Sequence, residues 1–123
     1  NAKIYANLPA VDLERAKKFY RDTLGLKEMS VPLPGIAMFE GGDGTALSIY
    51  EREATKADHT VAGFHVEDLE ATVKELRDHG ITFEEYDFPD FKTVDGIATM
   101  GDTKAAWFKD TEGNILCVDE TMA

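Results

Sequence analysis

The stretch DLERAKKFYRD, residues 12–22, decides the fold because it returns 56 residues later as DLEATVKELRD, residues 68–78. The two stretches are identical at six of eleven positions. A second pair, GTALSIYE at residues 44–51 and GNILCVDE at residues 113–120, repeats at an offset of 69. Repetition of this kind indicates that one supersecondary unit occurs twice in the chain.

Each repeated stretch predicts a helix that follows a strand. Asp12 and Asp68 are suitable N-caps, and Gly25 and Gly80 stand where the two helices should end. Between these residues, apolar side chains recur at helical spacing. The segments before the helices alternate between apolar and polar residues, which is typical of strands. The strands expected there are residues 3–9 and 60–67.

Three further strands are expected after each helix, so each half reads strand, helix, strand, strand, strand. Hairpin turns are expected at residues 41–44 and 110–113, and residues 52–59 form a polar linker. The 123 residues are therefore interpreted as a single α+β domain of two βαβββ modules, residues 1–51 and 60–123. The strands expected after the helices are residues 26–31, 35–40 and 45–51 in the first half, and residues 81–88, 103–109 and 114–121 in the second.

Composition excludes several classes of function. Thirteen basic and 24 acidic residues give a net charge of −11, which argues against binding to nucleic acid or to an anionic membrane. No apolar run approaches the ~20 residues of a membrane-spanning helix, and no signal peptide pattern is visible. Cys117 is the only cysteine, so no disulfide forms within the chain, and we expect a cytoplasmic protein.

Two phrases carry a resemblance to a known family. The helix entry VDLERAKKFYRDTLGL, residues 11–26, and the closing phrase AAWFKDTEGNILCV, residues 105–118, resemble the vicinal oxygen chelate superfamily. This superfamily contains glyoxalases, bleomycin resistance proteins and dioxygenases. The resemblance implies the glyoxalase/bleomycin resistance fold, with two βαβββ modules forming a curled, cup-shaped mixed sheet. It also implies a homodimer with ligand sites in clefts lined by that sheet.

The resemblance further implies where a metal ion would bind. Enzymes of the family carry His, Gln or Glu at four equivalent strand positions, which correspond here to Tyr5, Ser48, Val61 and Cys117. Val61 has no donor atom, Tyr and Ser are poor ligands, and a single thiolate does not hold a divalent ion alone. We therefore expect no metal cofactor.

The strand face around these positions is the expected ligand site. Its mixture of aromatic, amide, hydroxyl, imidazole and carboxylate groups suits a small organic ligand. Trp107 either lines this cleft or closes the core, and Cys117 is interpreted as a buried, unreactive thiol. No catalytic residue is assigned. The expected ligand-binding residues are Tyr5, Asn7, Ser48, Tyr50, His65, Trp107, Cys117 and Asp119.

Three hypotheses for function remain open. The first is metal-free binding or sequestration of a small drug or metabolite, which the acidic charge suggests is cationic or aromatic. The second is a lyase, isomerase or dioxygenase with a rearranged metal site, built from His59, His65 and either Asp119 or Glu120. The third is a non-catalytic dimeric scaffold.

The segment 89–102 is expected to be a long loop, because it contains a proline and two glycines. Four apolar residues flank or occupy it. They either form a lid over the ligand site or pin the loop to the sheet. These residues are Phe88, Phe91, Ile97 and Met100.

Overall fold

The computed structural model describes residues 4–31, 33–56, 58–89 and 91–121. These residues form two compact units. The described residues of unit 1 are those up to residue 56 together with residues 110–114, and the remainder belong to unit 2. The turn at residues 110–114 therefore belongs to unit 1, although the strands on either side of it belong to unit 2.

Unit 1 contains a four-stranded sheet with the order β1-β4-β3-β2. The first and last strands, β1 and β4, pair in parallel, and the other pairs are antiparallel. The elements are β1 (Tyr5–Ala10), α1 (Leu13–Lys18), the π-helical segment η1 (Phe19–Thr23), β2 (Lys27–Met29), β3 (Ile36–Glu40), the short helix η2 (Gly42–Gly44) and β4 (Ala46–Glu51).

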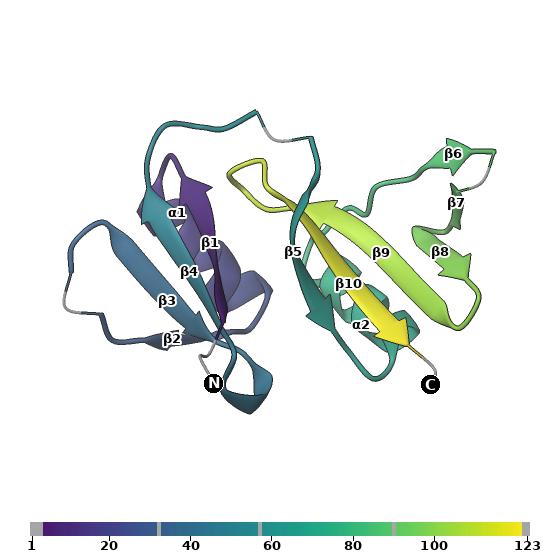
Figure 1. Cartoon of the computed structure of the whole chain (residues 1–123), viewed down its shortest axis with the longest axis horizontal. Coiled ribbons are helices and arrows are strands. Elements are labelled where there is room, and N and C mark those ends of the chain that lie inside the picture. The colour runs from purple at the N-terminus through teal and green to yellow at the C-terminus, as the bar shows by residue number, and fades with distance from the viewer. Residues whose placement is uncertain (1–3, 32, 57, 90, 122–123) are drawn as a thin grey trace. The chain divides into compact units, whose positions relative to one another are not determined.

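Helix α1 covers one face of this sheet (Figure 1). The Asp12 carboxylate accepts a hydrogen bond from the Arg15 backbone N–H and caps the helix, as its sequence predicts. Gly25 follows the helical segment with a φ of 74°, a conformation that glycine adopts without strain. Fully buried side chains fill the space between helix and sheet, namely Leu8, Ala16, Tyr20, Phe39 and Ile49.

The turn at residues 110–114 is bonded into the interior of unit 1. The hydroxyl of Tyr20, which is fully buried, donates a hydrogen bond of 2.5 Å to Asp110 Oδ2. Asn114 Nδ2 donates to the same oxygen at 2.8 Å and to the Pro9 carbonyl at 3.0 Å. Burial raises the pKa of Tyr20, and the Asp110 carboxylate raises it further, so Tyr20 remains a donor.

Glu112, in the same turn, binds the start of α1. Its carboxylate accepts hydrogen bonds from the backbone N–H groups of Val11 and Asp12, at 3.0 and 2.9 Å. It also forms an ion pair with Arg15, whose Nε lies 2.7 Å from Glu112 Oε2. Burial by itself would raise the pKa of Glu112, but these hydrogen bonds outweigh it and lower the pKa to about 2.

Unit 2 contains a six-stranded sheet with the order β5-β10-β9-β8-β7-β6. Its first and last strands, β5 and β10, again pair in parallel. The elements are β5 (Thr60–His65), α2 (Leu69–Asp78), β6 (Asp87–Phe88), β7 (Phe91–Val94), β8 (Ile97–Met100), β9 (Thr103–Lys109) and β10 (Ile115–Thr121). The α+β class is thus confirmed, with a mixed sheet in each unit.

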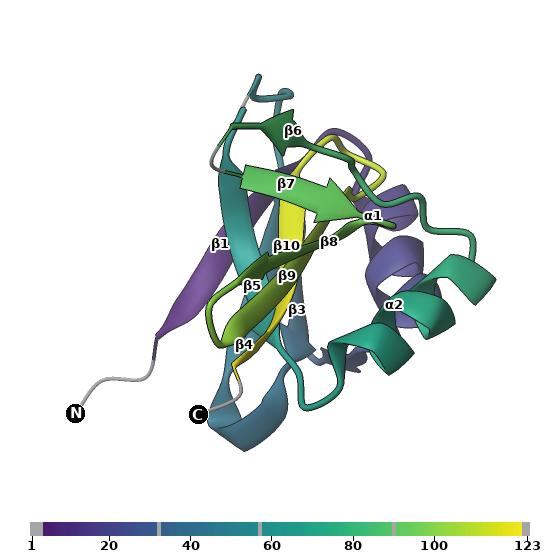
Figure 2. The same ribbon diagram turned by 90° about the vertical axis from the view of Figure 1, so that its right-hand side faces the viewer.

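Helix α2 lies along one side of strands β8, β9 and β10 (Figure 2). Asp68 caps it by accepting from the Ala71 N–H, and Gly80 follows it with a φ of 94°, so both predicted helix ends are confirmed. Among the described residues, neither α1 nor α2 has the length and hydropathy needed to cross a bilayer. The buried side chains of α2 are Leu69, Val73 and Leu76.

Two predictions for the second half are wrong. Residues 81–88 form an isolated bridge at Phe83 and the two-residue strand β6 rather than a full strand. Residues 89–102 are not a long loop, because they contain the paired strands β7 and β8. Asp95 and Gly96 make the turn between them, with φ values of 52° and 82°. Two consecutive positive φ values are typical of a tight hairpin, which an Asp-Gly pair favours.

The turn between β7 and β8 is held by side chains from outside it. Arg77 Nη2, on α2, donates to the Asp95 carbonyl at 2.7 Å. Glu85 Oε1 accepts from the Gly96 N–H at 2.7 Å and from the Thr93 hydroxyl at 2.6 Å. These hydrogen bonds hold the turn, whose Asp95–Gly96 pair is a local hairpin signal that the loop prediction did not use.

The Glu112→Gln variant should be less stable than the wild type at pH 7, by about 1–2 kcal/mol, because it loses the charged cap of α1. The pKa of Glu112 is lowered from 4.5 to about 2, so its stabilisation is present above pH 4.5 and is lost as the pH falls towards 2. Urea unfolding between pH 7 and pH 2.5 should therefore show the two proteins converging. The Glu75→Gln variant, at an exposed position on α2, is the control, and an equal loss there would contradict this assignment.

Candidate functional site

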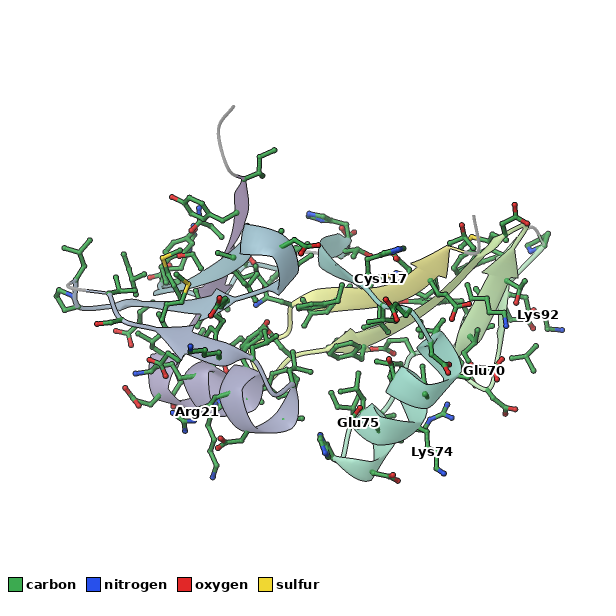
Figure 3. The ribbon with its side chains drawn as sticks, turned by 90° about the horizontal axis from the view of Figure 1, so that it is seen from below. Arg21, Glu70, Lys74, Glu75, Lys92 and Cys117 are labelled. Carbon is green, nitrogen blue, oxygen red and sulfur yellow. The ribbon has the colours of Figure 1, made fainter. Side chains whose placement is uncertain are left out.

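The face of the unit 2 sheet that lies opposite α2 carries the candidate site and is called the open face below. Alternation along β10 places Leu116 and Val118 in the core, and both are buried. Cys117 and Asp119 therefore point to the open face. Figure 3 shows α2 beneath the sheet, with Glu70 on the helix and Cys117 at the level of the strands.

A β-bulge determines which residues of β5 lie beside Cys117. Ile115 pairs with Thr60, but the next residue, Leu116, pairs with Ala62, so Val61 is an extra residue in the ladder. Beyond the bulge, Gly63 is the partner of Cys117 and His65 is the partner of Asp119. The neighbour of Cys117 on β5 is thus a glycine, and Cys117 itself is buried.

The four positions expected for a metal do not offer a suitable donor set. Val61 has no donor, and burial raises the pKa of Cys117 to about 11, with a further contribution from Asp119, so the thiolate is disfavoured. Ser48 is buried in unit 1 beside Asn7, its partner on β1. Among the described residues, no three His, Cys, Asp or Glu side chains gather in a way that could hold a metal ion.

The residues proposed for a rearranged metal site, His59, His65 and Asp119 or Glu120, do not come together as one cluster. His59 precedes β5, is exposed, and lies 3.9 Å from the exposed Asp58. Glu120 Oε1 accepts a hydrogen bond of 2.8 Å from the Leu69 N–H at the start of α2, so this carboxylate is used in capping the helix. Only His65 and Asp119 of the proposed set contact one another.

His65 and Asp119 form a hydrogen-bonded pair on the open face. His65 Nδ1 lies 2.6 Å from Asp119 Oδ1, and the imidazole side chain is 68% exposed. Because a carboxylate accepts hydrogen bonds, this geometry assigns the proton to Nδ1. In the neutral imidazole Nε2 is then the acceptor, and in the imidazolium both ring nitrogens donate.

Four aromatic rings gather on the same side of the sheet. The ring centroid of Trp107 lies 5.1 Å from that of Phe91 and 5.7 Å from that of Tyr86, both in edge-to-face geometry. Phe88 stacks on Tyr86 at 6.2 Å and is 58% exposed. Such contacts stabilise the cluster, but the exposed Phe88 ring leaves apolar surface for another aromatic group. This aromatic cluster is defined as Tyr86, Phe88, Phe91 and Trp107.

Trp107 belongs to the open face and not to the core beneath α2. It is the partner of Cys117 across β9 and β10, and its neighbours Ala106 and Phe108 are the fully buried residues of this strand. Its indole Nε1–H donates to Thr60 Oγ1 at 3.1 Å, which links β9 to the bulge in β5. The sequence left both placements open because it did not define the faces of β9.

The four apolar residues considered as a lid lie on two different sides of the sheet. Phe88 and Phe91 join the aromatic cluster, whereas Ile97 lines a groove beside α2. Met100 is exposed at the end of β8. Tyr86, the central ring of the cluster, was not singled out from the sequence, since the irregular segment before β6 gives no clear alternation.

In unit 1, the remaining predicted residues lie on strands β1 and β4. Asn7 is the partner of Ser48, and Tyr5 is the partner of Ala46. Tyr50 is the partner of Pro9 and Ile36. Tyr5 is half-exposed and borders a shallow pocket of about 320 Å³. The other residues that line this pocket are Ile4, Met29, Glu40, Gly44, Thr45 and Ala46.

A further groove of about 550 Å³ runs between α2 and strands β7 and β8. Its lining includes the Lys104–Glu70 ion pair, 3.2 Å between Nζ and Oε1, and the apolar side chains of Val73 and Ile97. The sequence prediction did not include this groove, because it depends on the β7–β8 hairpin and the prediction placed a long loop there.

With this geometry in view, comparison with known proteins identifies the family. The sequence profile of the Glyoxalase/Bleomycin resistance protein/Dioxygenase superfamily matches residues 4–118. The chain belongs to this superfamily, which confirms the resemblance seen in the sequence. None of the curated proteins matches the chain significantly in sequence.

Several solved structures share the fold at low sequence identity. A glyoxalase family protein from Bacillus anthracis has a TM-score of 0.75 at 20% identity, over 98% of this chain and 95% of that one. TnmS3, an antibiotic binding protein from Streptomyces sp. CB03234, has a TM-score of 0.71 at 19% identity, over 98% and 96%. A lactoylglutathione lyase from Agrobacterium tumefaciens has a TM-score of 0.68 at 22% identity, over 98% and 93%. The fold therefore occurs in both binding proteins and enzymes.

Cys117 should react slowly with iodoacetamide at pH 8 in the folded protein. The rise of its pKa from 9 to about 11 lowers the thiolate fraction at this pH about 100-fold, and burial slows access further. Mass spectrometry of the folded protein and of the urea-unfolded chain measures the difference in alkylation rate.

The Asp119→Asn variant should react faster than the wild type, because it removes a charge that disfavours the thiolate. The Asp102→Asn variant, in an exposed turn, should react at the wild-type rate. Equal rates in the folded and unfolded wild type would contradict the assignment.

Proposed function

We propose that this protein binds a small organic ligand on the open face of unit 2 without a divalent metal, and so sequesters or carries it. The observation that supports this most directly is the aromatic cluster beside Cys117, with the exposed Phe88 at its margin. The exposed imidazole of His65 supplies a polar group on the same face. An apolar surface with few polar anchors is typical of small-molecule sites.

The donor chemistry supports a metal-free site. A metal of the kind used by enzymes of this superfamily would need His, Gln or Glu at the four strand positions, and Val61 and Cys117 do not fit that role. The His65–Asp119 pair offers one imidazole and one carboxylate, too few ligands for a tight divalent site. We therefore derive no reaction step through a metal.

The printed name of TnmS3 describes an antibiotic binding protein, and a similar role is proposed for this chain. The net charge of −11 favours a neutral or cationic ligand over an anionic one and disfavours nucleic acid. We further propose a homodimer in the cytoplasm. The exposed Tyr5 on the edge strand β1 supports self-association, and the free thiol of Cys117 suits a reducing compartment.

Aromatic drugs, including cationic ones, should raise the melting temperature of the protein and change the fluorescence of Trp107, its only tryptophan. A ligand at 100 times its Kd stabilises the folded state by about 2.7 kcal/mol, which a thermal-shift screen detects. The Phe88→Ala variant should lose most of this shift. Phe88 is exposed, so its removal should leave the fold intact.

Tyr5→Ala is the matched control, because Tyr5 is also an exposed aromatic residue but lies in unit 1. Binding that persists in Phe88→Ala and disappears in Tyr5→Ala would move the site to unit 1. The absence of stabilisation by any compound would favour the scaffold hypothesis instead.

Protein purified without chelators should contain no stoichiometric divalent metal, because the expected ligand positions hold a valine and a protonated thiol. Elemental analysis and titration with Zn²⁺, Ni²⁺ and Fe²⁺ measure this. Tight binding of one equivalent that is lost in His65→Ala would support the metal-dependent alternative and overturn the proposal.

A further inference from the structure

The groove beside α2 exists because one helix is too narrow to cover the whole sheet of unit 2. An α-helix with its side chains is about 10 Å wide, whereas six strands span about 24 Å. Helix α2 packs on β9 and β10, and the β7–β8 hairpin continues the sheet beyond them (Figure 2). The groove of about 550 Å³ lies on the side of α2, so it is separate from the open face, and its size is that of a small-molecule site.

Two polar contacts define the ends of the groove. At one end, Lys104 Nζ on β9 lies 3.2 Å from Glu70 Oε1, near the start of α2. At the other end, Arg77 Nη2 in the last turn of α2 donates to the Asp95 carbonyl at 2.7 Å. Glu70 and Arg77 are seven residues apart on the helix, so the groove is about 10 Å long.

Apolar side chains lie between these two ends. Val73 on α2 is 2% exposed, and Ile97 on β8 is half-buried. Val94, the partner of Ile97 on β7, lines the same groove and is 67% exposed. The exposed Val94 side chain leaves apolar surface that a ligand can cover, and its removal from water favours binding.

Charges of both signs line the groove towards Asp95. Lys74 and Asp78 follow one another on α2 at a spacing of four residues, and Lys74 is labelled in Figure 3. Among the described residues, neither of them nor Asp95 takes part in an ion pair. Arg77 uses one N–H for the Asp95 carbonyl and forms no ion pair with a described carboxylate. The opposite end carries no such charges, because Lys104 and Glu70 neutralise one another.

We propose that this groove binds a free α-amino acid with an apolar side chain of about the size of leucine. The ligand carboxylate pairs with Lys74 and Arg77, and its ammonium group pairs with Asp78 or Asp95. The ligand side chain packs beside Val94 in the apolar part of the groove. An α-amino acid carries both charges close together, as the groove does. An extended dipeptide separates its charges by about 7 Å and would place one of them among the apolar side chains.

Four probes separate the parts of the ligand: L-leucine, glycine, L-leucinamide and 4-methylpentanoate. The last three each lack one feature of leucine, namely the apolar side chain, the carboxylate or the ammonium group. Titrations of the full chain are followed by NMR through the backbone amides of Val94, Gly96 and Ile97. Leucine should shift these amides in a saturable way, without shifting the indole N–H of Trp107 on the open face. Each of the other probes should bind about 5-fold more weakly, the value of one exposed ion pair or of the buried side chain.

Variants test the two recognition elements without disturbing the fold. Lys74→Gln should reduce the preference for leucine over leucinamide, because Lys74 is exposed and binds only the ligand carboxylate. Lys18→Gln, at an exposed position on α1, is the matched control and should keep that preference. Val94→Ser should reduce the preference for leucine over glycine. A merely structural role would change the affinity for all probes alike and leave these ratios unchanged.

Several outcomes would overturn the inference. Equal affinity for leucine and 4-methylpentanoate would show a site for simple anions and not for amino acids. Unchanged ratios in Lys74→Gln, or the absence of saturable shifts in the β7–β8 hairpin with leucine, would exclude the groove as the binding site. None of these results bears on the proposed function, which is read from the response of Trp107 to aromatic ligands.

Discussion

Parallel pairing of the first and last strand within each unit is the constraint on which the remaining structure depends. β1 pairs with β4, and β5 pairs with β10, both in parallel. Parallel neighbours cannot be joined by a tight turn, so the chain must cross one face of the sheet between them, and it does so through α1 and α2. The helix covers that face, and the opposite face keeps polar and aromatic side chains without a covering helix.

The same pairing sets the chemistry of the open face through its register. One extra residue at Val61 shifts the ladder, so Gly63 and His65 become the neighbours of Cys117 and Asp119. Without the bulge, every side chain of β5 after it would turn to the other face of the sheet, because the side-chain period is two. The contact between His65 and Asp119 therefore depends on an irregularity of a single residue.

The turn at residues 110–114 belongs to unit 1, although it lies far along the chain from the other elements of that unit. Asp110 and Asn114 are buried and bonded to Tyr20 and Pro9, while Glu112 caps α1. A turn between two strands of unit 2 thus completes the interior of unit 1. Removal of either buried partner would leave a polar group without a hydrogen bond, which is costlier than the net gain from forming one. The phrase KDTEGN, residues 109–114, which contributes to the family resemblance, therefore has a structural role in this chain.

The sequence by itself determined the two repeats, both helix caps and the family. These features depend on residue type and local spacing, which a single sequence contains. Only the tertiary structure decided the β7–β8 hairpin, the bulge in β5 and the position of Trp107 on the open face. Each of these depends on hydrogen bonds between distant residues, such as Arg77 to Asp95, and on the register of neighbouring strands. The pairing of His65 with Asp119 and the role of Tyr86 follow from that register, and they define the surface on which a ligand is proposed to bind.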